Sequence, residues 1–397
     1  MWCRRNIKFR IWVGLIALLT ARCGKQEPHT VIPAFYHWQT TLALSPVERT
    51  YLDSLHCKKL YVKVLDIGRD PLTGAIQPYS RLEIADTAGL SAFELVPVVF
   101  ITNEVFQNIT EEKIEWLAGK VAEVIAAFVS TPPPAPPPNG RGDAVSSKSP
   151  LPFGGGAGGG VELQFDCDWT PSTRDAFFLF LKKMKKRLPE NARLSATIRL
   201  HQYKFPQKTG VPPVERGMLM FYNTGDIENP EAGNSIFQPD DARKYLTGAP
   251  KNYPLPLDLA LPVFTWALVY RDGELWKIIP EMPEGELADT TRFKIIQTLN
   301  PSRPTTHHSS LIAHHSTFSI QKGTFIAGHY LRPGDLLRVE SIPPDLLREA
   351  ARLAANADLA NNATVAFFHL DSAIVRRYPY QLLDSICQVI NFPEKKK

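Results

Sequence analysis

Residues 161–169 constrain the fold more than any other stretch of this 397-residue chain, because apolar and polar side chains alternate along the whole segment. In a β-strand, successive side chains point to opposite faces. The predicted apolar face carries Val161, Leu163, Phe165, Cys167 and Trp169, and the predicted acidic face carries Glu162, Gln164, Asp166 and Asp168. A helical pattern begins directly afterwards. The segment therefore fits a strand that packs under helices and turns its acidic face into a barrel or a cleft.

Asp166 and Asp168 lie two residues apart on this acidic face. Two carboxylates at that spacing repel each other, which tends to raise the pKa of one of them. Carboxyl groups with shifted pKa values cluster at functional sites, but structural ion-pair networks contain them as well. The strand alone therefore leaves two interpretations open, a functional acid pair and an edge strand with one wetted face.

The whole chain repeats a pattern of strands followed by helices. Eight strands are predicted, at residues 31–38, 60–66, 95–101, 161–169, 194–200, 217–223, 259–266 and 363–369. Most are separated by helical segments, although Gly89-Leu90-Ser91-Ala92-Phe93 supplies little helix between the second and third strands. Eight strands with mostly helical crossovers predict an α/β fold, the (β/α)8 or TIM barrel.

Two interruptions divide this pattern. Residues 130–160 hold a proline tract and a glycine tract, a composition typical of extended and flexible segments, so we predict a disordered insertion before the fourth strand. A longer excursion, at 270–362, elaborates the crossover after the seventh strand, and Arg271-Asp272-Gly273 at its start is predicted to form a hairpin turn. Because the alternation continues across the first interruption, residues 23–397 are predicted to form a single barrel domain.

The N-terminus resembles an export signal. Four basic residues precede an apolar run at 11–19, which is shorter than the roughly 20 residues of a membrane span. Leu19-Thr20-Ala21-Arg22-Cys23-Gly24 is similar to a bacterial lipoprotein signal, which implies removal of residues 1–22 and lipidation of Cys23. We therefore expect a protein of the cell envelope, lipid-anchored on the periplasmic or surface face of a bacterial membrane. An uncleaved anchor and plain secretion are the alternatives.

Composition argues against several classes of function. The net charge of +5 is spread along the chain without a basic stripe, so a nucleic-acid partner is not expected. Cys57, Cys167 and Cys387 are too scattered for a disulfide framework or a zinc site. The pairs His307-His308 and His314-His315 lie among Ser, Thr and Pro, which is typical of a solvated loop. We expect no metal and no cofactor.

Polar and aromatic residues stand where the predicted strands end. A barrel gathers these ends around one pocket mouth, and rings mixed with acids and amides suit a sugar ligand, because rings stack on pyranose faces while polar groups bind hydroxyls. Asp166 and Asp168 are the candidate catalytic residues. The candidate substrate-binding residues are Trp38, Tyr203, Tyr222, Asn223, Trp266 and His369.

Three segments are similar, in the right order, to the barrel of glycoside hydrolase family 18, the chitinase-type enzymes. That family has Asp-x-x-Asp-x-Asp-x-Glu on the fourth strand, Met-x-Tyr-Asp at the end of the sixth, and a short apolar seventh strand with aromatic residues. The segments here are Asp166-Cys167-Asp168-Trp169-Thr170, Met220-Phe221-Tyr222-Asn223 and 259–266. In this register Leu163 replaces the first Asp, and Thr170 replaces the Glu that protonates the leaving oxygen. A register shifted by two puts Asp168 in the acid position with Asp166 behind it.

The resemblance implies a carbohydrate ligand, and three hypotheses follow. In the first, the protein binds glycans with little or no hydrolysis, because Thr170 stands in the place of the catalytic Glu. In the second, it is an active glycoside hydrolase in which Asp168 is the general acid and Asp166 its electrostatic partner. In the third, it is a structural lipoprotein of the cell envelope with a vestigial pocket. Whether the protein is an enzyme stays open at this stage.

Overall fold

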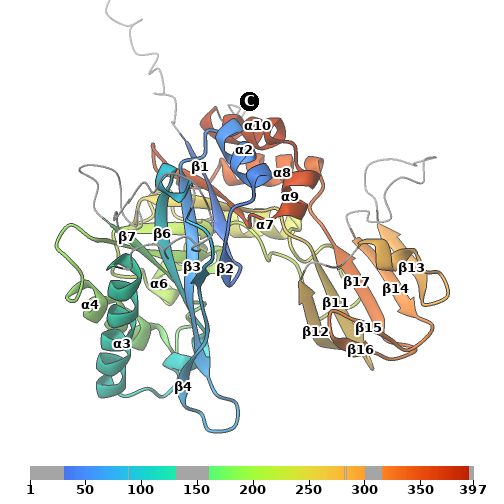
Figure 1. The fold of residues 1–397 in the computed structure, drawn as a ribbon, viewed down its shortest axis with the longest axis horizontal. Coiled ribbons are helices and arrows are strands. Elements are labelled where there is room, and N and C mark those ends of the chain that lie inside the picture. Colours follow the sequence, from blue (N-terminus) through green and yellow to red (C-terminus); the bar gives the residue numbers. More distant parts are fainter. Residues whose placement is uncertain are drawn as a thin grey trace, which may run out of the picture.

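The computed structural model describes residues 31–87, 89–130, 161–280, 282, 284–299 and 315–392. Eight parallel strands form a closed barrel in which β1 pairs with both β18 and β3 (Figure 1). These strands are β1 Ile32–His37, β3 Lys59–Arg69, β6 Glu94–Ile101, β7 Glu162–Asp166, β8 Arg193–Arg199, β9 Arg216–Met220, β10 Leu257–Pro262 and β18 Thr364–Phe368. The predicted (β/α)8 barrel is confirmed.

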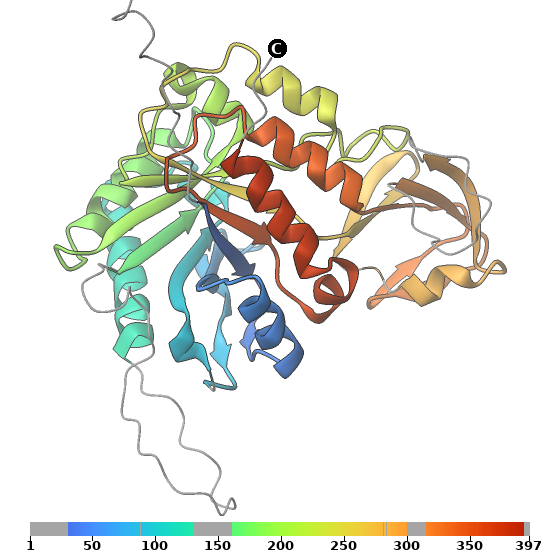
Figure 2. The ribbon, with the colours of Figure 1, turned by 90° about the horizontal axis from the view of Figure 1, so that it is seen from above.

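Helices surround this barrel (Figure 2). They are α2 Pro46–Ser54, α3 Glu111–Ser130, α4 Arg174–Lys185, α5 Leu200–Lys204, α6 Pro206–Thr209, α7 Pro239–Leu246, α8 Pro344–Ala354, α9 Ser372–Arg377 and α10 Tyr380–Asn391. Among the described residues, the connection from β3 to β6 holds no α-helix, as its sequence predicts. It contains β4 Ile76–Arg81, which pairs with β3 as an antiparallel hairpin, then β5 Glu83–Ile84, which pairs with β2 Thr41–Leu42, and the 3-10 helix Leu90–Ala92.

The two faces of β7 divide as the alternation predicts. The ring of Phe165 packs edge-on against Phe180 of α4 at 5.2 Å, and Trp169 stacks on Phe177 of the same helix at 5.4 Å. On the opposite face, Gln164 accepts a hydrogen bond of 2.6 Å from the Tyr36 hydroxyl inside the barrel. The strand ends at Asp166, earlier than the predicted 169, and residues 167–170 continue without strand pairing.

The barrel interior is polar and hydrogen-bonded at the N-terminal ends of the strands. Lys59 Nζ lies 2.7 Å from Glu162 Oε2, and the Ser195 hydroxyl donates to Glu162 Oε1 at 2.7 Å. Buried charges are tolerated when they are paired and hydrogen-bonded in this way. This network lies at the N-terminal ends of the strands, so its acid is structural and separate from the mouth.

The excursion after β10 folds into a second sheet, here called the insertion module (residues 266–340). Its five antiparallel strands run in the order β12-β11-β17-β14-β13. Their bounds are β11 Trp266–Arg271, β12 Glu274–Pro280, β13 Phe293–Leu299, β14 His315–Ile320 and β17 Leu336–Glu340. The module also contains a separate two-stranded sheet of β15 Thr324–Ile326 and β16 His329–Leu331, and a 3-10 helix at Glu284–Ala288. Phe318, Leu337 and Val339 belong to a core of its own. The predicted hairpin turn is confirmed, since Asp272 and Gly273 link β11 to β12 with φ of 54° and 86°.

Several expectations fall on residues that the structure does not describe. These are the signal at 1–22, the lipidation site Cys23, almost all of the insertion at 130–160, and His307, His308 and His314. None of the described helices is both long enough and apolar enough to cross a bilayer.

Candidate functional site

Aromatic side chains line one side of the barrel mouth, where the carboxyl ends of the strands meet. Neighbouring rings join into an aromatic strip: Phe100–Trp38 with centroids 6.2 Å apart, Trp38–Phe368 at 5.1 Å, Phe368–Phe264 at 5.7 Å and Phe264–Trp266 at 5.5 Å. All of these rings except Phe264 keep part of their surface exposed. The strip therefore offers ring faces and edges to a ligand at the mouth.

Tyr222 and Asn223 follow β9 at the edge of this strip. The Tyr222 ring lies 5.6 Å from Phe368 and 5.8 Å from Phe264, and burial raises the pKa of its hydroxyl well above its usual value. Asn223 has a φ of 54°, and its backbone N–H donates to the Ile236 carbonyl at 2.6 Å. Asparagine tolerates this left-handed conformation better than most residues, and its amide side chain is exposed.

Asp166 lies inside the barrel just below the mouth. It is almost fully buried, and its Oδ1 accepts a hydrogen bond of 2.7 Å from the Thr197 hydroxyl on β8. Loss of water raises the pKa of this carboxyl to about 6, the Arg199 guanidinium opposes that rise, and the charge of Asp168 adds to it.

Asp168 lies above the end of β7 in a bidentate ion pair with Arg199. The guanidinium Nη2 donates to Oδ2 at 2.6 Å, and Nε donates to Oδ1. Two parallel N–H···O bonds are the strong geometry for an arginine–carboxylate pair. Both oxygens of Asp168 are thus engaged by one partner, although 49% of the side chain stays exposed.

Position 170 belongs to a cluster of hydroxyl and amide groups. The Thr170 hydroxyl lies 2.9 Å from the Ser172 hydroxyl, and the Thr170 backbone N–H donates to the Thr173 hydroxyl at 2.9 Å. Thr173 in turn donates to Asn103 Oδ1 at 2.5 Å. These bonds close the turn between β7 and α4 without a carboxylate.

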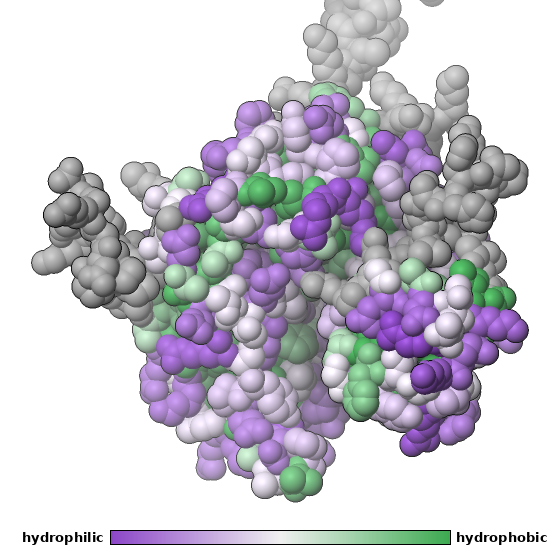
Figure 3. Space-filling view, turned by 45° about the vertical axis from the view of Figure 1, so that its right-hand side comes forward, coloured by the Kyte–Doolittle hydropathy of each residue, from purple (hydrophilic) through white to green (hydrophobic). Residues whose placement is uncertain are grey.

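A polar pocket of about 250 Å³ opens beside this ion pair. Its lining residues come from the ends of β7, β8 and β9 and from α5 and α7: Asp168, Arg199, Leu200, His201, Tyr222, Asn223 and Tyr245. Pockets for drug-sized ligands measure about 300–1,000 Å³, so this one suits a single small ring. The surface is hollowed between the barrel and the insertion module (Figure 3).

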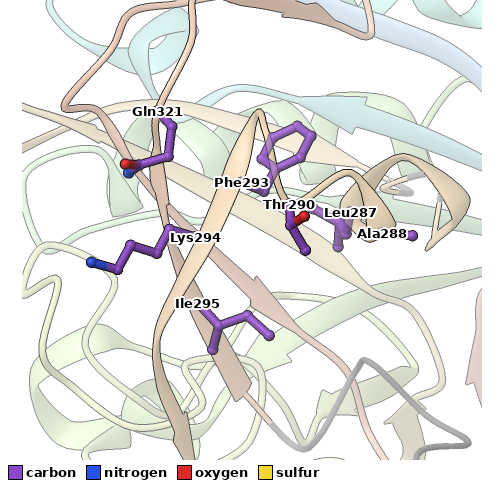
Figure 4. A pocket seen from close by; sticks show the side chains of 7 residues that line it. All are labelled: Leu287, Ala288, Thr290, Phe293, Lys294, Ile295 and Gln321. Carbon is purple, nitrogen blue, oxygen red and sulfur yellow. The ribbon is translucent and has the colours of Figure 1, made fainter.

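A second pocket, of about 360 Å³, lies on the insertion module (Figure 4). Its lining residues are Leu287, Ala288, Thr290, Phe293, Lys294, Ile295 and Gln321. Lys294 is the one charged residue among them. Acids, amides and a guanidinium converge at the barrel mouth instead, so the mouth is the candidate site. Among the described residues, no three His, Cys, Asp or Glu side chains gather in a way that would hold a metal ion.

The structure brings Trp38, Tyr222, Asn223 and Trp266 to the mouth with the two aspartates. Trp266 arrives from the insertion module, because β10 ends at Pro262 and Trp266 opens β11. The predicted seventh strand at 259–266 therefore joins two different strands.

The two other predicted binding residues are engaged by neighbouring groups, and only Tyr203 is buried outside the mouth, because the His369 ring lies 5.4 Å from Phe368 of the strip. The Tyr203 ring packs against Tyr253 at 5.5 Å, and its hydroxyl accepts the Asp358 backbone N–H at 3.0 Å, so the side chain supports a loop outside the mouth. His369 follows β18, mostly buried, with Nδ1 3.8 Å from Asp371 Oδ2. Burial lowers the pKa of His369, while Asp371 opposes that change.

Several residues of the mouth were missed from sequence, among them Phe264, Phe368, Thr197 and Arg199. Phe264 and Phe368 look like ordinary core residues of apolar strands, and nothing in their local pattern marks them. Thr197 and Arg199 had a usable signal, since alternation along the fifth strand places both on the inward face. That strand pairs with β7 so that Gln164, Asp166 and Asp168 each meet the residue 31 positions later.

Comparisons with known proteins add structural likeness only. No protein-family model and no curated protein sequence matches the chain. Among solved structures, the spore cortex-lytic enzyme SleL of Bacillus cereus is 14% identical, with a TM-score of 0.44, over 92% of this chain and 75% of that one. A chitinase of Rhizomucor miehei is 9% identical, with a TM-score of 0.43, over 90% and 99%.

Catalytic domain 2 of the Ostrinia furnacalis Group II chitinase gives similar values, 10% identity and a TM-score of 0.43 over 91% of this chain and 96% of that one. Likeness at these levels carries no argument about activity. The chain has the (β/α)8-barrel fold on the strength of its own closed eight-stranded sheet.

Proposed function

We propose that the barrel mouth binds a glycan and does not hydrolyse it. The observation that carries this proposal is the aromatic strip beside a polar pocket whose exposed carboxylate, Asp168, is engaged on both oxygens by Arg199. Such a surface recognises sugars by two kinds of contact. Rings cover the apolar faces of pyranoses, and the charged and amide groups of Asp168, Arg199 and Asn223 exchange hydrogen bonds with hydroxyls.

The same geometry argues against turnover. Glycoside hydrolysis generally needs an acid that delivers a proton to the leaving oxygen and a second group that stabilises the positive charge of the sugar. Thr170 supplies no carboxyl group, Asp168 is occupied by Arg199, and Asp166 is buried below both. A ligand seated on the strip would meet no free acid among the candidates.

One observation favours the second hypothesis, an active hydrolase. The pKa of Asp166 is raised to about 6, which is the direction that a general acid requires. If a bound sugar displaced Arg199 from Asp168, the two carboxyl groups would become an acid pair. The test of function therefore measures binding and product release together.

The experiment uses a panel of labelled amino-sugar oligosaccharides. We expect at least one to bind without release of shorter products. Trp38→Ala and Trp266→Ala should each weaken binding about tenfold or more, as expected for the loss of an aromatic anchor. Trp116→Ala is the matched control, because Trp116 is a half-exposed tryptophan on α3, away from the mouth.

Other outcomes decide between the rivals. Product release that disappears in Asp168→Asn would establish the hydrolase and overturn the binding-only proposal. Absence of binding to every sugar, together with a co-purifying envelope protein, would favour the structural role.

We further infer that the mature protein is anchored to a bacterial membrane through lipid on Cys23. The support is the basic and apolar leader before that cysteine. In a bacterial host, labelled fatty acid should enter the wild-type chain, which should sediment with membranes. Cys23→Ser should lose both properties, and label retained in that variant would refute lipidation at Cys23.

A further inference from the structure

Trp266 connects the aromatic strip to the insertion module through its indole N–H. The ring lies 5.5 Å from Phe264 in the strip, while Nε1 donates to Glu340 Oε2 at 2.7 Å. Glu340 is the last residue of β17, and its side chain is completely buried. A carboxylate of the module thus holds a ring of the mouth.

That carboxylate is held by an ion pair at Oε1 and by hydrogen-bond donors at Oε2. Arg338 Nε lies 2.7 Å from Oε1, and both side chains are fully buried. Oε2 also accepts from the Ser235 backbone N–H at 2.9 Å and from the Ser235 hydroxyl at 2.6 Å. A buried charge with this many partners cannot move without exposing unpaired groups.

The same cluster is tied to the loop after β9. Arg338 Nη2 donates to the Asp226 carbonyl at 3.1 Å, and Nη1 donates to the Asn229 carbonyl. On the other side of that loop, Asn234 Nδ2 donates to the Ser341 carbonyl at 2.7 Å. Loop and module therefore present Glu340 to Trp266 as one unit.

We propose that Glu340 is a positioning residue of the glycan site, acting through the indole N–H of Trp266. A partly exposed tryptophan otherwise rotates about two side-chain bonds, and a ligand that stacks on it must stop that rotation. A hydrogen bond to a fixed acceptor sets the plane of the ring before the ligand arrives, which lowers the entropic cost of binding. That the ligand is a glycan rests on the proposed function. The positioning of Trp266 by Glu340 is measurable without a ligand.

The first measurement follows the indole N–H groups of the seven tryptophans in the full chain labelled with ¹⁵N-tryptophan. Trp266→Phe assigns one signal by removing it. We expect that signal to exchange with solvent much more slowly in the wild type than the signal of Trp116, which is half exposed. Exchange as fast as that of Trp116 would overturn the proposal, whatever the protein binds.

The second measurement compares two variants at the same carboxylate. Glu340→Leu removes the acceptor, so it should release the Trp266 indole and weaken binding of the best oligosaccharide of the panel about tenfold, the loss typical of one buried hydrogen bond to a charged group. Ser235→Ala removes another donor to the same oxygen but leaves Trp266 in place, so its affinity should stay within about twofold. An equal loss in both variants would show that the carboxylate acts through the loop and would overturn the proposal.

The two proposals fail in different ways. If no sugar binds the wild type, the proposed function is wrong, while slow exchange of the Trp266 indole still supports the positioning. If Glu340→Leu does not fold, the exchange measurement on the wild type decides alone.

Discussion

The burial of Asp166 lowers the free energy of unfolding by an amount that depends on pH. The pKa of its carboxyl is raised to about 6 from the ordinary value of 3.8, chiefly because the group is cut off from water. Since the folded pKa lies above the unfolded one, the folded state loses stability relative to the unfolded state as pH rises through this interval. The cost is absent at low pH and complete well above pH 6.

Asp166→Asn should remove this cost, because asparagine keeps an oxygen for the Thr197 hydroxyl and carries no charge. We expect the free energy of unfolding to rise by about 3 kcal/mol at pH 8, since each pKa unit corresponds to about 1.4 kcal/mol. At pH 4 the gain should be below about 1 kcal/mol. Urea unfolding at both pH values measures the difference, and an equal gain at pH 4 would contradict an electrostatic cause.

The ion-pair partner of Asp168 could not be predicted from the sequence. Alternation along residues 161–169 identified Asp166 and Asp168 as inward-facing. It did not reveal Arg199, because an ion pair between neighbouring strands depends on their register. The register that sets Phe165 beside Ala196 also carries Asp168 to Arg199, and no local pattern fixes that offset.

At the scale of elements, an ion pair joins three strands at the N-terminal end of the barrel. Arg216 on β9 donates from Nε and Nη2 to the two oxygens of Asp258 on β10, at 2.6 and 2.7 Å. Asp258 Oδ1 also accepts the backbone N–H of Thr364 on β18 at 2.5 Å. Burial raises the pKa of Asp258 although Arg216 opposes that rise. The ion pair therefore does not fully offset the cost of burying the carboxylate, while the guanidinium relies on the two carboxylate oxygens as its acceptors.

Asp258→Ala should destabilise the protein by leaving the Arg216 guanidinium and the Thr364 backbone N–H without their acceptor oxygens. We expect about 3 kcal/mol, the low end for a buried pair that loses one partner, because 21% of the Arg216 side chain stays exposed. Asp168→Ala is the matched control, since it breaks a bidentate pair of the same type at the exposed rim and should cost less than about 1 kcal/mol. Equal losses in urea unfolding would show that burial does not set the cost.

The sequence predicted elements well where periodicity was long and apolar. All eight predicted barrel strands exist. Errors arose where a strand was bent into a different sheet: the continuous apolar run at 259–266 hides the step from β10 to β11. Periodicity cannot reveal such a step, because the end of β10, the start of β11 and the residues between them are all mostly buried and therefore read as one apolar run.

At the scale of the whole molecule, the barrel and the insertion module have separate hydrophobic cores. The module core includes Phe318, Leu337 and Val339, and the barrel core includes β1 and β18. A largely buried cluster of Trp266, Ser235, Arg338 and Glu340, here called the Glu340 cluster, joins the two. Neither the second core nor its sheet order was visible in the sequence, because the pairing of β11 with β17 joins segments far apart in the chain, such as Trp266 with Glu340.

Separate cores predict separate opening. Phe318→Ala should destabilise the module by about 3–5 kcal/mol, the cost of truncating a buried phenylalanine. Amides of β14 and β17 should then exchange hydrogen faster, while amides of β1 and β18 should keep their protection. Hydrogen exchange followed by mass spectrometry resolves the two regions. A uniform rise in exchange rate across the barrel would show instead that the Glu340 cluster makes both cores unfold as one cooperative unit. In that case the ring of Trp266 could not be released without unfolding the barrel.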